Sequence, residues 1–262
     1  MPDMHLKEKV AIVTGAGSRN EGIGNGRAAA ILLAREGARV VLVDTEQAAA
    51  DATAAIIAKE GGASIVCRAD VTSPADCAAV VEAAIAKWGR VDILVNNVGI
   101  GGPPGSAVDV DPEAWDEGLR VNVTSMMLMA KYAIPEMRKQ GGGAIVNIAS
   151  VAGLRGGHPH LLYATTKGAI VQMTRAMASN HGPEGIRVNC IAPGMVYTPM
   201  VYARGMPDEL REKRRRRSLL QTEGTGWDVG NAVVYLASNQ SRWVTGVVLP
   251  VDAGTTAGTL PL

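Results

Sequence analysis

Short runs of apolar, β-branched residues alternate along this chain with longer alanine-rich stretches, and this alternation limits the possible folds more than any other feature. The runs are Val10–Val13, Val40–Val43, Ser64–Cys67, Ile93–Val95, Ala144–Ile148, Arg187–Ile191 and Val247–Val251. The first five are almost entirely apolar, which is expected of strands that are covered on both faces. Helix-compatible stretches separate them, near residues 24–36, 46–60, 74–88, 112–139, 160–181 and 228–238. The alternation predicts an α/β fold, a doubly wound parallel sheet of about seven strands with helices on both faces.

Length, charge and cysteine content exclude several classes of protein. The 262 residues contain no repeat or linker, which fits a single domain over residues 1–262. A net charge of +1 gives no general attraction to nucleic acid or to an anionic membrane, and no apolar run approaches the ~20 residues that span a bilayer. The 3 cysteines are scattered, which favours a reducing compartment over a disulfide framework or a metal site. We therefore expect a cytoplasmic protein that binds neither nucleic acid, membrane nor metal.

A glycine-rich loop follows the first predicted strand and precedes a helix. Its glycines include Gly15, Gly17 and Gly22, and glycine lets the backbone turn tightly and approach a pyrophosphate at a helix N-terminus. An ordinary glycine-rich turn would show the same composition. The next predicted strand, however, ends at Asp44, about 20 residues beyond the loop, where a carboxylate can accept hydrogen bonds from ribose hydroxyls. The two features together predict a dinucleotide site in a Rossmann-type domain.

The carboxylate of Asp44 also bears on which dinucleotide binds. It would repel the additional phosphate of NADP, and its neighbours Thr45 and Glu46 supply no compensating cation. Arg19, inside the glycine-rich loop, is the one nearby residue that could reverse this preference. Asp44 could also cap the helix that follows, and the two roles are compatible. We expect NAD to be preferred over NADP.

A tyrosine and a lysine stand four residues apart in the helix-compatible stretch near 160–181. This spacing puts Tyr163 and Lys167 on one helix face. A free tyrosine has a pKa near ~10, and an adjacent ammonium lowers it, so such a pair can move a proton at neutral pH. Ser150 ends the fifth predicted strand, at the sheet edge where ligands bind, and could donate a hydrogen bond to a substrate oxygen. A surface packing pair and a turn cap are the respective alternatives.

These motifs, together with others in the same order, resemble those of the short-chain dehydrogenase/reductase family. The resemblance extends from about Lys7 to Gly254. It is carried by the glycine-rich loop, Asp70-Val71, Asn96-Asn97-Val98-Gly99, Asn122, Ser150, the Tyr163…Lys167 pair and Pro193-Gly194. Each motif is modest alone, but all of them in order are highly specific. The resemblance implies a Rossmann-type oxidoreductase with a tyrosine and a lysine separated by three residues.

The resemblance implies a role for each of four catalytic residues. Tyr163 would be the acid/base, and Lys167 would lower the pKa of this tyrosine and hold the nicotinamide ribose. Ser150 would orient the carbonyl or hydroxyl of the substrate. Asn122 would position a water in a proton relay to Lys167.

The resemblance also implies a set of cofactor-binding residues, which run through most of the chain. They are Gly15, Gly17, Asn20, Gly22, Ile23, Asp44, Asp70, Val71, Asn96, Asn97, Gly99, Tyr163, Lys167, Val196 and Thr198. Within this set, Asp70-Val71 would hold the adenine and Asn96-Asn97 would line the adenosine ribose. Val196 and Thr198 would meet the nicotinamide carboxamide.

The glycine-rich loop departs from the family pattern. Six residues, Ala16 to Glu21, stand between its first two motif glycines, where the family commonly has three. A similar lengthening occurs in the divergent enoyl-reductase branch, but that branch spaces its tyrosine and lysine more widely than Tyr163 and Lys167, which argues against enoyl reduction. The longer loop leaves open which side chain of residues 18–20 touches the cofactor. A second departure, Val98 in place of the usual alanine, adds bulk beside the cofactor and removes no polar group.

The segment from about 195 to 226 lies where the family carries a lid over the substrate. It contains the densest run of charge in the chain, residues 211–217, which include five arginines. Such a run is consistent with a solvated helical face or with a docking patch for an anionic carrier or a phosphorylated substrate. Arg155, His158 and His160 precede Tyr163 on a stretch that would form a wall of the pocket. Structural or surface roles are the default for these three, and a substrate carboxylate is the alternative.

We therefore expect an NAD-dependent enzyme that interconverts a secondary alcohol and a ketone by hydride transfer. An NADPH-linked β-ketoacyl reductase is the alternative within the enzyme class, which Asp44 opposes and the arginine run favours. A dinucleotide-sensing scaffold without turnover is the alternative from another class, and the intact set of four catalytic residues argues against it. The family commonly forms tetramers through the helices that carry Asn122 and Tyr163 and through its last strand, so a homotetramer is expected.

Overall fold

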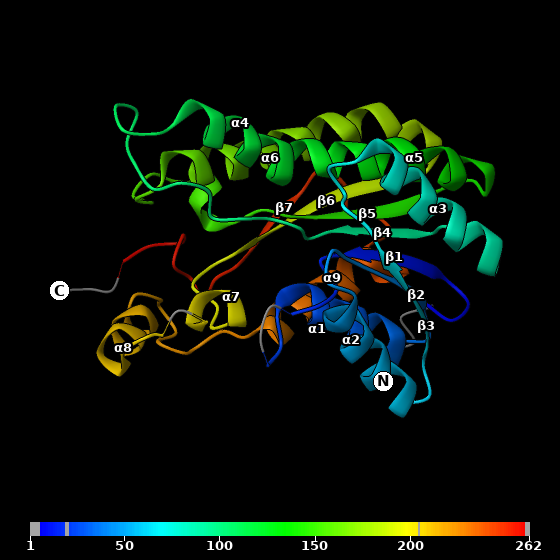
Figure 1. Cartoon of the computed structure of the whole chain (residues 1–262), viewed down its shortest axis with the longest axis horizontal. Helices are drawn as coiled ribbons and strands as arrows, with labels where there is room; N and C mark the ends of the chain where they lie inside the picture. Colours follow the sequence, from blue (N-terminus) through cyan, green and yellow to red (C-terminus); the bar gives the residue numbers. More distant parts are fainter. Residues whose placement is uncertain (1–5, 19–20, 204, 260–262) are drawn as a thin grey trace.

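The computed structural model describes residues 6–18, 21–203 and 205–259, which are arranged in three layers (Figure 1). Seven parallel strands form one sheet in the order β3-β2-β1-β4-β5-β6-β7. The strands are β1 Val10–Thr14, β2 Arg39–Asp44, β3 Ala63–Arg68, β4 Ile93–Asn96, β5 Gly143–Ile148, β6 Ile186–Pro193 and β7 Val248–Val251. The doubly wound α/β fold and the number of strands predicted from the sequence are confirmed.

Helices cover both faces of the sheet, as predicted. One layer consists of α1 Asn25–Arg35, α2 Gln47–Lys59 and α9 Gly226–Ala237 (Figure 1). The other consists of α3 Pro74–Trp88, α4 Pro112–Leu119, α5 Ser125–Lys139 and α6 Leu161–His181. Two shorter helices follow β6: α7 Pro199–Tyr202, which lies beside the layer of α1 and α9, and α8 Asp208–Arg216, which lies farther out (Figure 1). They lie in the segment expected to form the lid.

Alternate residues of the central strands face opposite helix layers. In β1, Ala11 and Val13 pack into the cluster that contains residues of α1 and α9, whereas Val10 and Ile12 pack into the cluster that contains residues of α3 and α5. All four side chains are fully buried. Successive strand residues point to opposite faces, so a strand that is covered on both sides must be apolar throughout. This is the physical reason for the continuous apolar runs in the sequence.

The stretch 112–139, which the sequence predicts as helical, is helical throughout but contains a turn of a different helix type. The helix α4 ends at Leu119, one π-helical turn spans Arg120–Thr124, and α5 begins at Ser125. Asn122 lies within this turn and is fully buried. Single π turns inside helices are frequent at functional sites, because they change the direction of one side chain. The predicted helical stretch is confirmed, and hydrophobic periodicity does not report the local change of helix type within it.

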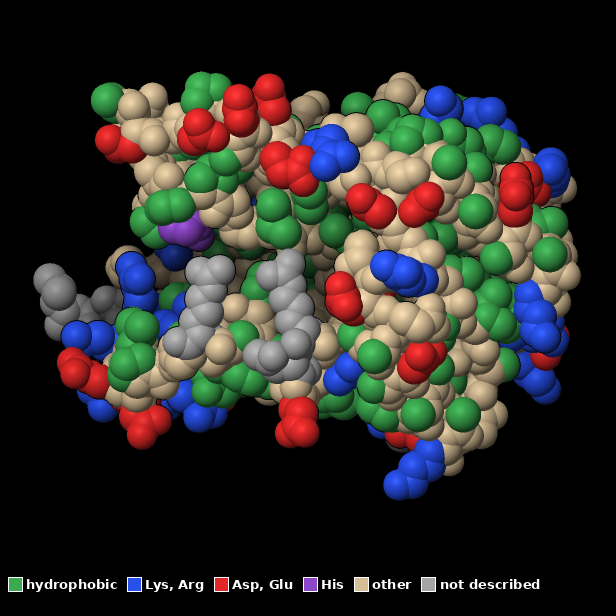
Figure 2. Space-filling model, viewed as in Figure 1, with side chains coloured by type: hydrophobic (Ala, Val, Ile, Leu, Met, Phe, Trp, Pro, Cys, Tyr) green, Lys and Arg blue, Asp and Glu red, His purple; other side chains and the backbone are tan. Residues whose placement is uncertain are grey.

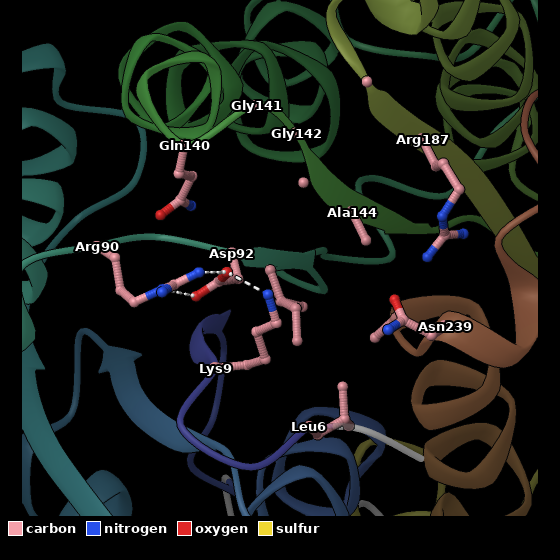
Figure 3. A pocket seen from close by; sticks show the side chains of 14 residues that line it. Leu6, Lys9, Arg90, Asp92, Gln140, Gly141, Gly142, Ala144, Arg187 and Asn239 are labelled. Atoms are coloured by element: carbon pink, nitrogen blue, oxygen red, sulfur yellow. Dashed lines mark hydrogen bonds and ion pairs between the residues drawn. The ribbon is translucent and has the colours of Figure 1, made fainter.

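A charged cluster closes the edge of the sheet at which the strands begin (Figure 3). The Asp92 carboxylate accepts hydrogen bonds from Lys9 Nζ at 3.0 Å, from Arg90 Nε and Nη2 at 2.7 and 2.6 Å, and from the backbone N–H of Val10 at 2.9 Å. Burial raises the pKa of Asp92, but the bonds from Arg90, Val10 and Lys9 together outweigh it and hold this pKa below its ordinary value. The cluster lines a polar cavity of about 250 Å³ and ties the starts of β1 and β4 together.

Candidate active site

A cavity of about 790 Å³ opens at the opposite edge, where the strands end. Residues after four neighbouring strands line it, namely Gly15 after β1, Asp44 at the end of β2, Asn97 after β4 and Ser150 after β5. The chain order reverses between β1 and β4, and in open α/β sheets ligands bind at this point outside the carboxyl ends of the strands. The fold thus brings most of the predicted site residues to one cavity.

The glycine-rich loop and the start of α1 form one end of this cavity. A Cβ atom on Gly26 would lie 2.1 Å from the carbonyl oxygen of Gly15, and one on Gly15, whose φ is +64°, would lie 2.9 Å from Asn97 Nδ2. The N-cap residue of α1, Gly24, gives the helix no side-chain cap, so its first-turn N–H groups are left for a ligand. Asn25 Oδ1 is buried and has no partner among the described residues. An anionic pyrophosphate fits this arrangement.

The carboxylates of the cavity lie together near the ends of β2 and β3. Asp44 accepts hydrogen bonds from the N–H groups of Gly17 at 2.9 Å and Glu46 at 3.1 Å. Asp70 Oδ1 accepts from the N–H and hydroxyl of Thr72, at 2.9 and 2.8 Å. Asp44, Glu46 and Asp70 all line the cavity, beside the buried side chain of Val71. Carboxylates beside an apolar wall suit the ribose and adenine of a dinucleotide, so the residues present fit the adenosine half of such a cofactor.

Ser150, Tyr163 and Lys167 converge at the other side of the cavity. Ser150 follows β5, and α6 carries Tyr163 in its first turn and Lys167 one turn later. Burial raises the pKa of the Tyr163 phenol, and the hydrogen bond with the Ser150 side chain lowers it by less. The sequence led us to expect a pKa lowered by Lys167, but in this structure burial is the dominant cause and the shift has the opposite sign.

Lys167 is buried, with 4% of its surface exposed. Its ammonium donates a hydrogen bond to the carbonyl oxygen of Ile148 at 3.0 Å and lies 5.6 Å from the ring centroid of Tyr163. Burial lowers the pKa of Lys167 to about 8, and the neighbouring Cys190 thiol offsets only part of this effect. Because a pKa in this range is close to neutrality, Lys167 can exchange protons as well as carry charge.

Asn122 lies behind the wall of the cavity and does not line it. Its Oδ1 accepts from the N–H of Ile100 at 2.7 Å, and its Nδ2 donates to the Ile100 carbonyl at 2.9 Å and to Thr166 Oγ1 at 3.0 Å. A Cβ atom on Gly99 would lie 3.3 Å from Lys167 Nζ and 3.4 Å from Asn122 Oδ1. The lysine and the amide therefore both lie beside Gly99, which has no side chain to fill the space next to them.

Asn96 is placed differently from the expectation that it lines the adenosine ribose. Its side chain is 1% exposed, and its Nδ2 donates to Asn147 Oδ1 at 2.9 Å and to the carbonyl of Met126 at 3.4 Å. Asn96 is absent from the cavity wall, whereas Asn97 lines it. The Nδ2 atom of Asn97 donates hydrogen bonds to the carbonyl oxygens of Thr14 and Gly15, at 3.1 Å each. Because neighbouring residues of an extended chain point to opposite sides, only one of the two asparagines can face the cofactor.

The lengthened loop displaces two further predicted residues from the cavity wall. The carbonyl of Gly22 accepts a hydrogen bond from Arg27 Nη1 at 2.8 Å, and Ile23 packs against the core cluster beneath α1 and α9. Asn20, like Arg19, lies outside the described residues. Gly24, Asn25 and Gly26 line the cavity instead. The sequence signal that identifies them is their place at the start of the helix rather than the glycine spacing of the family.

The remaining predicted residues lie at the cavity. Gly15, Gly17, Asp44, Asp70, Val71, Asn97, Gly99, Ser150, Tyr163, Lys167, Val196 and Thr198 all line it. The segment expected as a lid reaches the cavity through α7, and Tyr202 Oη donates a hydrogen bond to the carbonyl of Glu21 at 3.1 Å. Arg155, His158 and His160 also line the cavity, and the ring of His158 lies 4.7 Å from that of Tyr163. The sequence did not predict that Arg214 and Arg217 would line it as well.

Two negative findings hold for residues 6–18, 21–203 and 205–259. None of the helices there combines the length and apolarity needed to cross a bilayer. Within the same residues, no group of three or more His, Cys, Asp or Glu side chains could hold a metal ion.

Known proteins resemble this chain over nearly its whole length. A family model described as Enoyl-(Acyl carrier protein) reductase matches residues 17–256. The 2-(S)-hydroxypropyl-CoM dehydrogenase 3 of Xanthobacter autotrophicus is 39% identical over 256 residues, which make up 96% of this chain and 98% of that protein.

Two solved structures share the fold over nearly the whole chain. A crystal structure from Burkholderia xenovorans, described as a short-chain dehydrogenase/reductase, superposes with a TM-score of 0.91 at 44% identity and covers 97% of this chain and 99% of the other. The 7α-hydroxysteroid dehydrogenase complexed with NADH and 7-oxo glycochenodeoxycholic acid gives a TM-score of 0.88 at 36% identity, with 96% of each chain covered. This chain therefore belongs to the short-chain dehydrogenase/reductase family, which is a family of oxidoreductases.

Proposed function

We propose that this protein is an NAD(H)-dependent oxidoreductase that interconverts a secondary alcohol and a ketone. The convergence of Ser150, Tyr163 and Lys167 at one cavity, opposite a glycine-rich loop, is the observation that carries the proposal. The nicotinamide, when bound, supplies or accepts the hydride. The protein supplies the position of the substrate and the path of the proton.

Tyr163 is the proton donor and acceptor in this proposal. Its raised pKa keeps the phenol protonated at neutral pH, so it can give its proton to a carbonyl oxygen during reduction. In the direction of oxidation the phenol must first lose that proton, which the ammonium of Lys167 favours because it stabilises the phenolate. Ser150, already within hydrogen-bond reach of Tyr163, orients the substrate oxygen.

Asn122 completes the set as a positioning residue. Its amide fixes the backbone of Ile100, and its Oδ1 lies beside Gly99, as does Lys167 Nζ. A water held there would accept a proton from Lys167 and pass it toward solvent. We assign Asn122 to this relay.

The adenosine end supports NAD as the cofactor. The carboxylates of Asp44 and Glu46 face the cavity there and would repel an added phosphate. Among the described residues that line this end, none carries a positive charge, and Arg68 outside the wall donates to the carbonyl of Thr45 at 3.2 Å. A comparison of kcat/KM with NAD and NADP tests this assignment, and equal or better use of NADP would contradict it.

We further propose a cytoplasmic homotetramer. Apolar side chains are exposed on the surfaces through which the expected tetramer forms: Met127 of α5 is 44% exposed, and Trp243, shortly before β7, is 91% exposed. Burial of these two side chains between subunits would remove apolar surface from water. Multi-angle light scattering would give the subunit number directly.

The mechanism is tested by the variant Tyr163→Phe. Removal of the hydroxyl abolishes proton transfer, so turnover should fall at least 1,000-fold on the scale of general acid–base catalysis (about 10²–10⁴). The dissociation constant for NADH, measured by fluorescence titration, should change less than threefold because the ring remains. Turnover near that of the wild type would refute the assigned role of Tyr163.

A further inference from the structure

The charges along the cavity are strongly segregated. The carboxylates that line it, Asp44, Glu46 and Asp70, lie near the ends of β2 and β3. Arg155, His158 and His160 lie on the wall formed by residues 154–160, which lead into α6. Arg214 of α8 and Arg217, the residue after this helix, lie on another wall. Figure 2 shows a hollow with a histidine on its upper wall and Lys and Arg side chains gathered below it. The end of the cavity beyond the proposed cofactor site is thus positively charged.

The cations of the lid helix α8 and of the residue after it fall into two groups. Four are paired with carboxylates: Arg211 with Glu223, Lys213 with Glu209, and both Arg215 and Arg216 with Glu212. Arg214 and Arg217 are the two that line the cavity, and within the part of the chain that the structure describes neither forms an ion pair. The ordinary explanation for an arginine-rich helix, a solvated face with compensating acids, therefore accounts for the first group only.

Arg214 and Arg217 stand three residues apart, at neighbouring positions on the helix surface, and repel each other. Arg214 Nη2 donates to the carbonyl of Val196 at 3.4 Å, which places its guanidinium beside the proposed nicotinamide contact. Burial lowers the pKa of Arg214; Glu223 counteracts this shift, and Arg217 adds to it. Glu223 already accepts two hydrogen bonds from Arg211, at 2.6 Å each. The guanidiniums that face the cavity are therefore left without a carboxylate partner of their own.

We infer that the substrate is a secondary alcohol that carries an oxyanion group (a carboxylate, a sulfonate or a phosphate), and that Arg214 and Arg217 bind this group. Guanidinium groups recognise such groups through paired hydrogen bonds. Met195, Met200 and Val201 also line the cavity, on the segment whose Val196 carbonyl Arg214 contacts, and would provide apolar contact for the carbon skeleton. The inference rests on the proposed function, because it names the substrate class of the same site.

Matched substrates test the inference. A 4-hydroxycyclohexane ring bearing a carboxylate, a sulfonate or a phosphate would be compared with the corresponding carboxamide, sulfonamide or dimethyl phosphate ester, with NAD as the oxidant. Two charge-assisted contacts should give at least one anionic substrate a kcat/KM at least 50-fold above that of its neutral counterpart, mainly through KM. The double variant R214Q/R217Q should bring this ratio close to one, and R214K/R217K should retain a preference.

Arg216→Gln is the control, because this arginine lies on the same helix, carries the same charge and pairs with Glu212 away from the cavity. It should keep the wild-type ratio. The dissociation constant for NADH should stay within twofold in R214Q/R217Q. A tenfold weaker binding of NADH would instead assign the two arginines to the cofactor pyrophosphate and overturn the inference. So would a wild-type ratio near one for all three anions, or an unchanged ratio in the double variant.

The failure of the proposed function would be visible separately. If no alcohol, charged or neutral, reduces NAD, hydride transfer is refuted. Calorimetric titration of the three anions into the enzyme–NADH complex then tests anion binding by the two arginines independently of any reaction. Saturable binding that is lost in R214Q/R217Q and kept in R216Q supports the arginine site, and no binding of any anion overturns it.

Discussion

Replacement of Lys167 by methionine should stabilise the protein at neutral pH while it removes activity. Burial lowers the pKa of this lysine from 10.5 to about 8. A shift of this size corresponds to about 3 kcal/mol of destabilisation by the buried charge, at ~1.4 kcal/mol per pH unit. Methionine has similar length and no charge, but it leaves the carbonyl of Ile148 without its 3.0 Å hydrogen bond, which costs about 1–2 kcal/mol. The expected net gain at pH 7 is about 1–2 kcal/mol, or ~5 °C in Tm.

The dependence of this gain on pH follows from the direction of the shift. Below pH 8 the lysine is protonated in both the folded and the unfolded chain, and the folded state bears the full destabilisation. Between about pH 8 and 10.5 the folded state releases the proton while the unfolded state keeps it, so the wild type becomes more stable relative to the variant. Near pH 10.5 the missing hydrogen bond is the only remaining difference in stability between the two proteins, and the variant should be less stable by about 1 kcal/mol.

Urea unfolding at pH 7.0 and pH 10.3, followed by circular dichroism, measures both free energies. Lys87→Met, at an exposed position in the last turn of α3, is the matched control and should change stability by less than about 0.5 kcal/mol at either pH. A Lys167→Met variant that is less stable than the wild type at pH 7 would refute the reasoning. A difference that does not change with pH would refute it as well.

Three further predictions concern the two edges of the sheet. Gly26→Ala should weaken NADH binding more than 100-fold in a fluorescence titration, because the added Cβ would lie 2.1 Å from the carbonyl oxygen of Gly15. Gly24→Ala is the control: no atom lies within 4 Å of its added Cβ, so this variant should bind NADH nearly normally. Asp44→Ser should lower the ratio of kcat/KM for NAD to that for NADP at least tenfold, and an unchanged ratio would show that the carboxylate does not select the cofactor. Asp92→Asn should destabilise the protein by about 2 kcal/mol. This is less than for a fully buried ion pair, because the partners Lys9 and Arg90 are more than a third exposed and solvent screens their charges. The pKa of Asp92 is lower in the folded state than in the unfolded state, so the stabilisation by its carboxylate is complete above about pH 4. This stabilisation is lost as the pH falls through the pKa of the folded state. The urea unfolding curves of the variant and the wild type should therefore converge in acid.

Residues at strand ends could be predicted from the sequence because the topology itself places them. Once the strands are known to be parallel, Gly15, Asp44, Asn97 and Ser150 must all lie at the edge where the strands end, and the structure puts all four at the cavity. The i, i+4 spacing likewise fixes Tyr163 and Lys167 on one helix face.

Orientation within a motif could not be predicted in the same way. Asn96 and Asn97 are adjacent and chemically identical, and only the packing of Asn96 against Asn147 reveals which one faces inward. Arg214 and Arg215 differ in the same way, since one lines the cavity and the other pairs with Glu212. The sign of the Tyr163 pKa shift was also missed, because burial depends on the whole enclosure and not on the nearest charged residue.

The charged cluster at Asp92 has a consequence for the synthesis of the chain. Lys9 is separated from its partner Asp92 by 83 positions in the sequence. At about 5–20 residues per second, a ribosome needs on the order of 10 s to supply that partner. During this interval β1, which becomes a central strand, has an open edge on the side that β4 later occupies. Open apolar edges of this kind favour association with other chains, so we expect the first third of the protein to be prone to association while the chain is being synthesised.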